Sequence, residues 1–151
     1  MLGKHPAPID AQDLTGQDVH ITFDDGKTRL IYFVDPDCGW CRANASAFRT
    51  LSTVAQKSLS VIVMTKRTEH LDKFLEETRI PKNEILVIRA TATMRDLDLI
   101  ATPQTFLIAG NGEILSHWTG AYDHQNKKEI EKRFGVKLPD INDPTSSTSA
   151  S

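Results

Sequence analysis

The only two cysteines of this 151-residue chain are Cys38 and Cys41, which are separated by Gly39 and Trp40. An apolar run over 30–34 precedes them, and apolar residues at helical spacing follow them. A strand that leads into a helix at this point would expose the first sulfur and bury the second. Two thiols at this spacing can close a small disulfide ring and reopen it, so the motif predicts thiol–disulfide exchange on an α/β fold.

The length and the charge of the chain restrict its class. A chain of this length suits one domain with a hydrophobic core. The net charge is −2, with acidic and basic residues interspersed and no basic block, so we expect no nucleic-acid partner. No apolar run approaches the ~18 residues of a transmembrane helix, and 1–8 lack the apolar core of a signal peptide. We expect a soluble monomer as the chain is written.

Strand and helix patterns alternate along the chain. Residues 3–13 are predicted to be an extended lead-in, and turn signals at 24–27 and 111–112 predict two β-hairpins. The predicted strands are 19–23, 28–34, 59–64, 84–89, 104–109 and 113–119, and the predicted helices are 38–56, 68–79, 91–99 and 123–134. This order predicts a central mixed sheet with helices on both faces and an N-terminal β-hairpin extension. We expect a single domain over 1–138 and a disordered tail over 139–151.

The predicted helix start determines the chemistry of the two thiols. If the helix begins at Cys38, the unpaired backbone N–H groups of its first turn lower the pKa of that thiol, and Arg42 adds a cation. Asp35 and Asp37 oppose both effects, so we expect only a moderate depression. Cys41 lies one turn further on, where it can attack a mixed disulfide on Cys38. The disulfide closes too short a loop to stabilise the fold much, which favours a redox-active disulfide with no other cofactor.

A metal site is the competing interpretation of two closely spaced cysteines. A structural zinc site needs two more cysteine or histidine ligands. The histidines of the chain show no paired ligand spacing; they are His5, His20, His70, His117 and His124. We therefore expect no metal.

A second motif is Thr102-Pro103 immediately ahead of the apolar run 104–108. Proline donates no hydrogen bond and is tolerated at the start of a strand, so this is a sufficient explanation by itself. Together with the cysteine motif, it also predicts a cis-proline packed against the sulfurs, with the Thr102 backbone free to pair with an incoming peptide. Trp40 is expected either to contact that partner or to pack at the start of the helix, and the sequence leaves both open.

These motifs in this order resemble the thioredoxin fold, and within it the TlpA-type thiol–disulfide oxidoreductases, over roughly 3–134. The resemblance includes the lead-in 3–8 and the turn 111–112. It implies that Cys38 is the nucleophile, that Cys41 is the resolving cysteine, and that Pro103 is the cis-proline of a substrate groove.

The chain departs from that family at three positions around the motif. Asp37 stands where the family usually has tryptophan, Tyr32 where thioredoxins have a buried aspartate, and Asn44 where many TlpA-like proteins have glutamate. Both carboxylates that assist proton transfer from the buried thiol are therefore missing. Glu113, Asp35 or Asp37 are the candidates to replace them.

The direction of electron flow and the location follow from weaker arguments. Gly39-Trp40 contains neither the histidine that favours an oxidising disulfide nor the proline of thioredoxin, which favours a reductase of protein disulfides supplied by an upstream thiol donor. An oxidant or isomerase is the alternative. A second is a non-enzymatic copper-handling domain, although copper-delivering relatives usually have three residues between their cysteines and a distal histidine. The resemblance implies a periplasmic or extracytoplasmic protein whose membrane tether is missing from this chain; a cytoplasmic location is the alternative.

Overall fold

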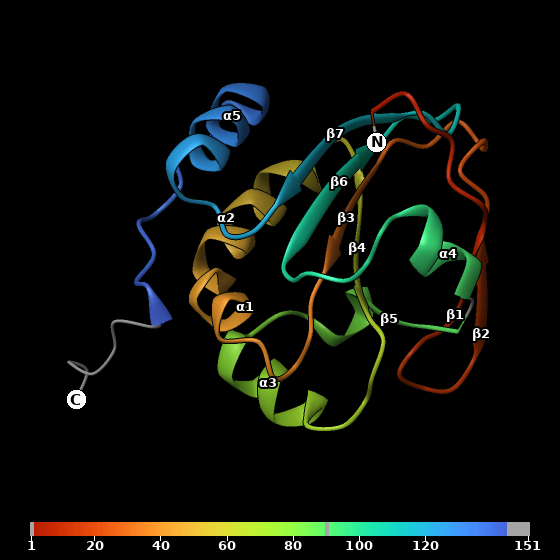
Figure 1. Ribbon diagram of the computed structural model, residues 1–151, viewed down its shortest axis with the longest axis horizontal. Coiled ribbons are helices and arrows are strands. Elements are labelled where there is room, and N and C mark those ends of the chain that lie inside the picture. Colours follow the sequence, from red (N-terminus) through yellow and green to blue (C-terminus); the bar gives the residue numbers. More distant parts are fainter. Residues whose placement is uncertain (1, 90, 145–151) are drawn as a thin grey trace.

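The computed structural model describes residues 2–89 and 91–144. These residues form the strands β1 (Ile9–Gln12), β2 (Asp18–Ile21), β3 (Arg29–Phe33), β4 (Ser60–Thr65), β5 (Ile85–Ile88), β6 (Gln104–Ile108) and β7 (Ile114–Thr119). The helices are α1 (Gly39–Ala43), α2 (Ala45–Ala55), α3 (Leu71–Thr78), the 3-10 turn η1 (Lys82–Glu84), α4 (Thr91–Asp96) and α5 (His124–Phe134). Figure 1 shows their arrangement.

The strands form one seven-stranded mixed sheet in the order β2-β1-β5-β4-β3-β6-β7. β3 pairs in parallel with β4 on one side and antiparallel with β6 on the other, over all five of its residues in both cases. The mixed sheet predicted from the sequence is therefore confirmed. Because β3 is central, the loop that follows it and the loop that precedes β6 lie at the same end of the sheet.

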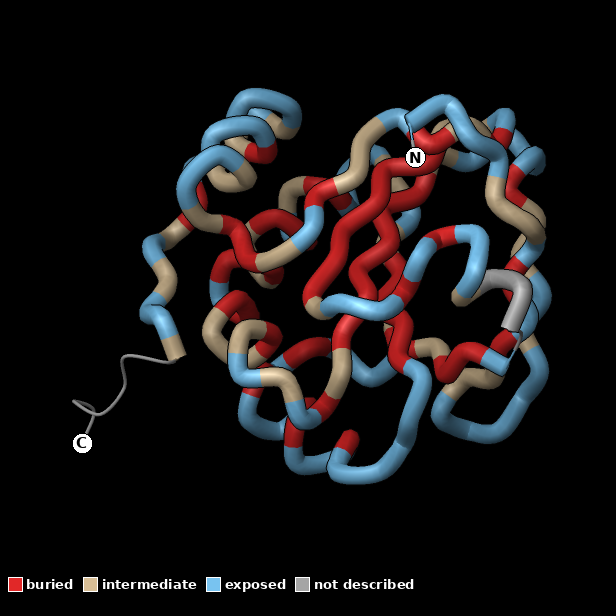
Figure 2. Tube along the Cα trace, viewed as in Figure 1, coloured by how far each residue is buried: buried red, intermediate tan, exposed pale blue. Residues whose placement is uncertain are grey.

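Side chains of β3 alternate between two hydrophobic layers, as the period of a strand requires. Leu30 and Tyr32 pack in the cluster that includes residues of α2, α3 and α5. Ile31 and Phe33 pack in the opposite cluster, which includes Leu97, just after α4. All five residues of β3 are buried, and Figure 2 shows the central strands as the most buried part of the molecule. Helices therefore cover both faces of the sheet, as predicted.

The hairpin predicted at the turn 24–27, between the strands 19–23 and 28–34, is wrong because these two strands do not pair. The turn 24–27 does not join two paired strands, since β2 pairs with β1 at the edge of the sheet, four positions from β3. Both edges of β3 are occupied by β4 and β6, which leaves no edge for β2. The turn itself is stabilised locally, because the Asp25 carboxylate binds Arg29 at 2.6 Å and accepts a hydrogen bond from the Lys27 amide. An N-terminal hairpin is present, but β1 comes from the predicted extended lead-in.

The turn 24–27 instead lies against the loop after β6. The Gly26 amide donates to the Gly110 carbonyl at 2.9 Å, and a Cβ atom at Gly110 would lie 2.5 Å from the Gly26 carbonyl carbon. Only glycine fits at Gly110 without moving the backbone. The second predicted hairpin is confirmed, since β6 and β7 pair antiparallel across 111–112.

The chain after α5 returns along the domain. Leu138 is buried, Ile141 packs against the cluster that contains Cys41, and the Lys127 ammonium binds the Asp140 carboxylate at 2.5 Å. Of the predicted tail over 139–151, Asp140 and Ile141 thus have defined contacts, and 145–151 lie outside the described residues. Within the described chain, no helix is long and apolar enough to cross a membrane.

Candidate active site

Cys38 lies at the N-terminal end of α1, five residues after the last residue of β3. Its backbone is extended, with φ −89° and ψ 118°, and it is the N-cap of the helix. The Cys41 amide donates a hydrogen bond to the Cys38 Sγ at 3.1 Å, and the same sulfur lies 3.6 Å from the carbonyl oxygen of Thr102. Cys38 is half-buried and Cys41 is fully buried, and both are free thiols. The predicted exposure order of the two sulfurs is the observed one.

The surroundings move the pKa values of the two thiols in opposite directions. The hydrogen bond from the Cys41 side chain, together with the side chain of Thr102 and the amides of Cys41 and Trp40, lowers the pKa of Cys38 to about 6, although partial burial opposes this. Burial raises the pKa of Cys41 well above its usual range, and the hydrogen bond to Cys38 adds to the increase. Near neutral pH, Cys38 is therefore the thiolate and Cys41 is the thiol.

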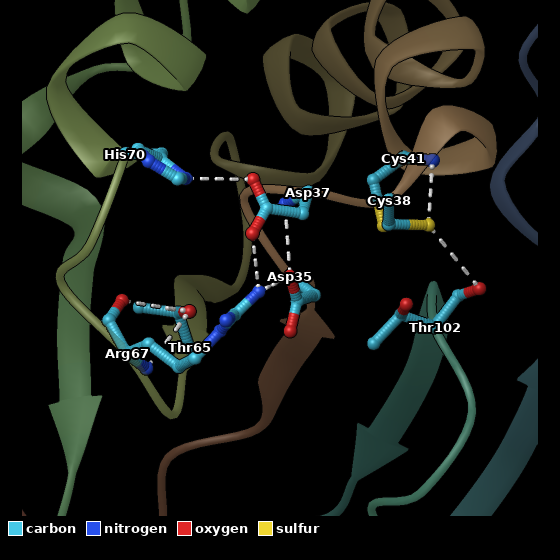
Figure 3. A network of polar contacts seen from close by, with 8 residues as sticks. All are labelled: Asp35, Asp37, Cys38, Cys41, Thr65, Arg67, His70 and Thr102. Atoms are coloured by element: carbon cyan, nitrogen blue, oxygen red, sulfur yellow. Dashed lines mark hydrogen bonds and ion pairs between the residues drawn. The ribbon is translucent and has the colours of Figure 1, made fainter.

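The two aspartates beside Cys38 are held by the side chains of Arg67 and His70 (Figure 3). The Arg67 guanidinium binds the Asp35 and Asp37 carboxylates, each at 2.7 Å. His70, at the N-cap of α3, places its Nδ1 3.0 Å from the second Asp37 oxygen. This cluster of Asp35, Asp37, Arg67 and His70 joins the loop after β3 to the loop after β4.

This cluster partly compensates the negative charge of Asp35 and Asp37 next to Cys38. The pKa of the Asp37 carboxyl is lowered, first by its hydrogen bond with His70 and then by Arg67. Burial would raise the pKa of Asp35 and is the largest single influence on it, but the hydrogen bond and charge of Arg67 together with the Asp37 amide outweigh it, and the net shift is downward. Both carboxylates are thus ionised and paired, and they oppose the Cys38 thiolate less than two free charges would.

The peptide bond between Thr102 and Pro103 is cis, as predicted from the sequence. The β3–β6 register places Phe33 opposite Gln104, so Pro103 meets the loop that carries Cys38. The Gly120 amide, after β7, donates to the Pro103 carbonyl at 2.8 Å. The structure therefore brings Thr102 and Pro103 to Cys38. Their part in binding a substrate stays a prediction.

A neutral network of hydrogen-bonded side chains occupies the interior around Tyr32 and Asn44. Asn44, fully buried between α1 and α2, donates from Nδ2 to the Tyr32 hydroxyl at 2.9 Å and accepts the Tyr122 amide at 2.7 Å. The Tyr122 hydroxyl in turn lies 2.7 Å from the Thr105 hydroxyl. Burial raises the pKa of both tyrosines, so neither is a base at neutral pH. The only signal of this network in the sequence is the polar Asn44 within an apolar helical stripe.

None of the three candidate replacements lies free in that interior. Glu113 directly precedes β7, at the end of the sheet opposite to the Pro103 end. Asp35 and Asp37 are paired with Arg67. No aspartate or glutamate among the described residues is buried.

Trp40 lies beside the start of the last helix. It is half-buried and lines a hollow of about 380 Å³ together with Tyr122, Lys127 and Ile141. One wall of this hollow is therefore the segment after α5. Whether Trp40 contacts a partner or only packs at the start of the helix is not decided by this position, and both stay predictions.

The described residues contain no group of three or more histidine, cysteine, aspartate or glutamate side chains arranged to hold a metal ion. Cys38 and Cys41 are thus not joined by further ligands within this part of the chain. The arrangement is suited to chemistry between the two sulfurs.

No protein-family model matches the sequence, and no curated protein matches it. Several solved structures do. The thioredoxin domain of a thiol-disulfide oxidoreductase from Bacteroides vulgatus matches with a TM-score of 0.69 at 20% identity, over 89% of this chain and 98% of that chain. A thiol:disulfide interchange protein from a Bacteroides species matches with a TM-score of 0.65 at 20% identity, over 89% and 91%. An exposed lipoprotein thioredoxin from Streptococcus pneumoniae matches with a TM-score of 0.59 at 12% identity, over 83% and 99%.

At these identities the likeness establishes the fold. The chain has the thioredoxin fold that its motifs resembled, and its structural neighbours are proteins of thiol–disulfide exchange.

Proposed function

We propose that this thioredoxin-fold chain is a thiol–disulfide oxidoreductase that acts on protein disulfides through Cys38 and Cys41. One observation carries the proposal: Cys38 is half-exposed with a pKa lowered to about 6, while Cys41, three residues on, is buried and protonated. A nucleophile must be a thiolate and must be reachable, whereas the resolving thiol must wait until the first exchange has taken place.

The proposed reaction has two exchanges. The Cys38 thiolate attacks one sulfur of the client disulfide, forms a mixed disulfide and releases the other client sulfur as a thiolate. Cys41 then loses its proton and attacks the Cys38 Sγ, which forms the Cys38–Cys41 disulfide and releases the second client sulfur. Two electrons pass from the two cysteines to the client, and an upstream thiol donor returns them.

The proton of Cys41 needs an acceptor in this scheme. Tyr32 and Asn44, which lie in the interior near Cys41, are neutral. The client thiolate released in the first exchange is then the strongest base at the site, so we propose that it accepts the proton. This makes the second exchange depend on the client sulfur staying near Cys41.

We propose the reducing direction for this couple. Strong oxidants have nucleophiles with pKa values near 3.5, and thioredoxin has one near 7. The value of about 6 for Cys38 is closer to that of thioredoxin. An extracytoplasmic location is also proposed, supported by the neighbour from Streptococcus pneumoniae that is described as an exposed lipoprotein.

The reduction potential of the Cys38–Cys41 couple tests the proposal. We would equilibrate the protein against dithiothreitol or glutathione buffers and follow Trp40 fluorescence, with Cys41→Ser as the control that cannot form the disulfide. A two-electron transition near −270 mV supports a reductase. A value well above about −180 mV would indicate an oxidant or isomerase instead. Absence of a transition, with tight Cu(I) binding by the reduced protein, would replace exchange with metal handling.

A further inference from the structure

The loop 97–102, between α4 and β6, carries an apolar side chain into solvent. Ile100 is 83% exposed, the highest value among the large apolar side chains found exposed in the described part of the chain. Leu97 and Leu99, which both precede it, are 0% and 2% exposed and pack in the core. The loop is therefore anchored just ahead of Ile100, and Ile100 lies in the chain between these anchors and Thr102. We call 97–102 the Ile100 loop.

Side chains from two strands and their flanks hold this loop in one shape. The Gln104 Nε2 donates to the carbonyls of Asp98 at 3.0 Å and Ala101 at 2.8 Å. The Lys66 ammonium donates to the Leu99 carbonyl at 3.3 Å. Asp98 has φ of 51°, in the left-handed region that is unusual for a residue other than glycine. Such a backbone persists only where its surroundings determine it, and here three hydrogen bonds do so.

The orientation of Gln104 is itself determined. Gln104 is 2% exposed, and because both hydrogens of its Nε2 are used by the loop, its Oε1 must accept. The His117 Nε2 lies 2.7 Å from this oxygen and therefore carries a proton and donates it. The His117 ring is stacked on Phe106 at 4.3 Å, which fixes its plane. The scaffold of the loop thus extends back to β7.

The Ile100 loop ends at the nucleophile. Thr102 is the last residue of the loop, and its carbonyl oxygen is 3.6 Å from the Cys38 Sγ. Two residues of chain span at most about 7 Å, so the backbone of Ile100 lies within about 7 Å of the backbone of Thr102. In Figure 1 the segment between α4 and β6 crosses to the end of the sheet where α1 begins, and Figure 2 shows the part of it next to β6 as mostly exposed. The loop that carries Ile100 thus contacts the sulfur to which a client would be disulfide-bonded, through Thr102.

A single apolar side chain on a surface is ordinary. Ile100 differs because a rigid, buried scaffold presents it next to a reactive sulfur, so contact with a partner requires no ordering of the loop. We propose that Ile100 is a docking contact for client proteins, and that it selects an extended segment with a large apolar side chain within about two residues of the reacting cysteine. This inference rests on the proposed function and names its substrate class.

The test compares disulfide-linked peptides that differ only in the residue two positions from the cysteine: leucine, serine or aspartate. The small 2-hydroxyethyl disulfide serves as a probe with nothing to dock. For Ile100→Ser, we expect kcat/KM for the leucine peptide to fall about tenfold (1.4 kcal/mol), with the serine peptide and the small disulfide unchanged. Ile100→Leu should restore the leucine peptide. The matched control is Leu115→Ser on β7, where the leucine is 36% exposed, and it should leave all rates unchanged.

A second variant tests the scaffold. Gln104→Leu retains Ile100 but removes the hydrogen bonds to the loop, so it should raise KM for the leucine peptide more than it lowers kcat. Gln17→Met, a surface change far from the loop, is its control. Thermal unfolding midpoints show which variants are folded.

Three results would overturn the docking role. Ile100→Ser could leave the leucine peptide unaffected, it could slow the small disulfide equally, or it could dissociate a dimer of the wild-type protein, which would make a second copy the occupant. The proposed function fails in a different way, since the wild-type protein would then exchange with no disulfide at all.

Discussion

The backbone amide of Cys41 donates a hydrogen bond to the Cys38 Sγ over 3.1 Å. This contact stabilises a charge on the outer sulfur without exposing the inner one, because Cys41 itself stays buried. Two cysteines one helical turn apart therefore differ in protonation because their surroundings differ.

The reactivity of reduced Cys38 should follow a pKa of about 6. The rate of alkylation by iodoacetamide, measured from pH 4 to 9, should be half-maximal near that value, and Cys41→Ala should move the midpoint upward because it removes the largest stabilising contact. Since the folded pKa lies below that of an unfolded cysteine, about 8.5, the reduced protein should gain stability as the pH rises from about 6 to 8.5 and lose it as the pH falls through 6. A midpoint above about 8 would contradict this assignment.

Arg67→Gln should raise the pKa of Cys38 by about half a unit, because Asp35 and Asp37 would then stand unpaired beside the thiolate. The alkylation profile measures the change, which should shrink at high salt. Arg133→Gln, at the far end of α5, is the control and should have no effect. Adding Asp37→Asn to the Arg67 variant should recover part of the shift, and failure to do so would mean that charge is not the cause.

Asn44→Ala should destabilise the protein by about 3 kcal/mol, because it leaves the Tyr122 amide and the Tyr32 hydroxyl without partners in the core. Urea unfolding followed by circular dichroism measures the loss. The exposed Ser46→Ala, two residues along the same helical segment, should change stability by less than about 0.5 kcal/mol. Equal stability of the two variants would show that the hydrogen bonds of Asn44 do not stabilise the fold.

Gly110→Ala should destabilise the protein by about 2 kcal/mol or more, because its Cβ would lie 2.5 Å from the Gly26 carbonyl carbon. Gly39→Ala is the comparison: its Cβ would meet only the Pro144 side chain at 3.4 Å, an ordinary contact. Thermal unfolding should separate the two variants clearly. A Gly110→Ala protein as stable as the wild type would mean that the turn 24–27 can move.

Most strands of the sheet could be predicted from the sequence, because each is an apolar run that ends at turn residues next to it in the chain. The sites of Cys38 and Pro103 follow from turn and capping chemistry that is also local. The predicted pairing of 19–23 with 28–34 was wrong. An Asp-Gly sequence indicates a turn at Gly26, but it does not determine which strands pair on either side of the turn. That outcome is decided by β4 and β6, which occupy both edges of β3.

The electrostatics of the site could not be predicted for the same reason. Asp35 and Asp37 are visible in the sequence next to Cys38, but Arg67 is about 30 positions away and reaches them only through the pairing of β3 with β4. The role of Asn44 depends on Tyr32 and Tyr122, which are distant in the chain. Both contacts are products of the fold.

The contact between Cys38 and Thr102 spans 64 positions of the chain. During synthesis at roughly 5–20 residues per second, the cysteine pair emerges about 3 to 13 s before the residue that completes its surroundings. Thr102 is one of the groups that lower the pKa of Cys38, and it reaches the sulfur only when β6 pairs with β3. The full nucleophilicity of Cys38 is thus a late product of folding, although the contacts with Cys41 and Trp40 are available as soon as α1 forms.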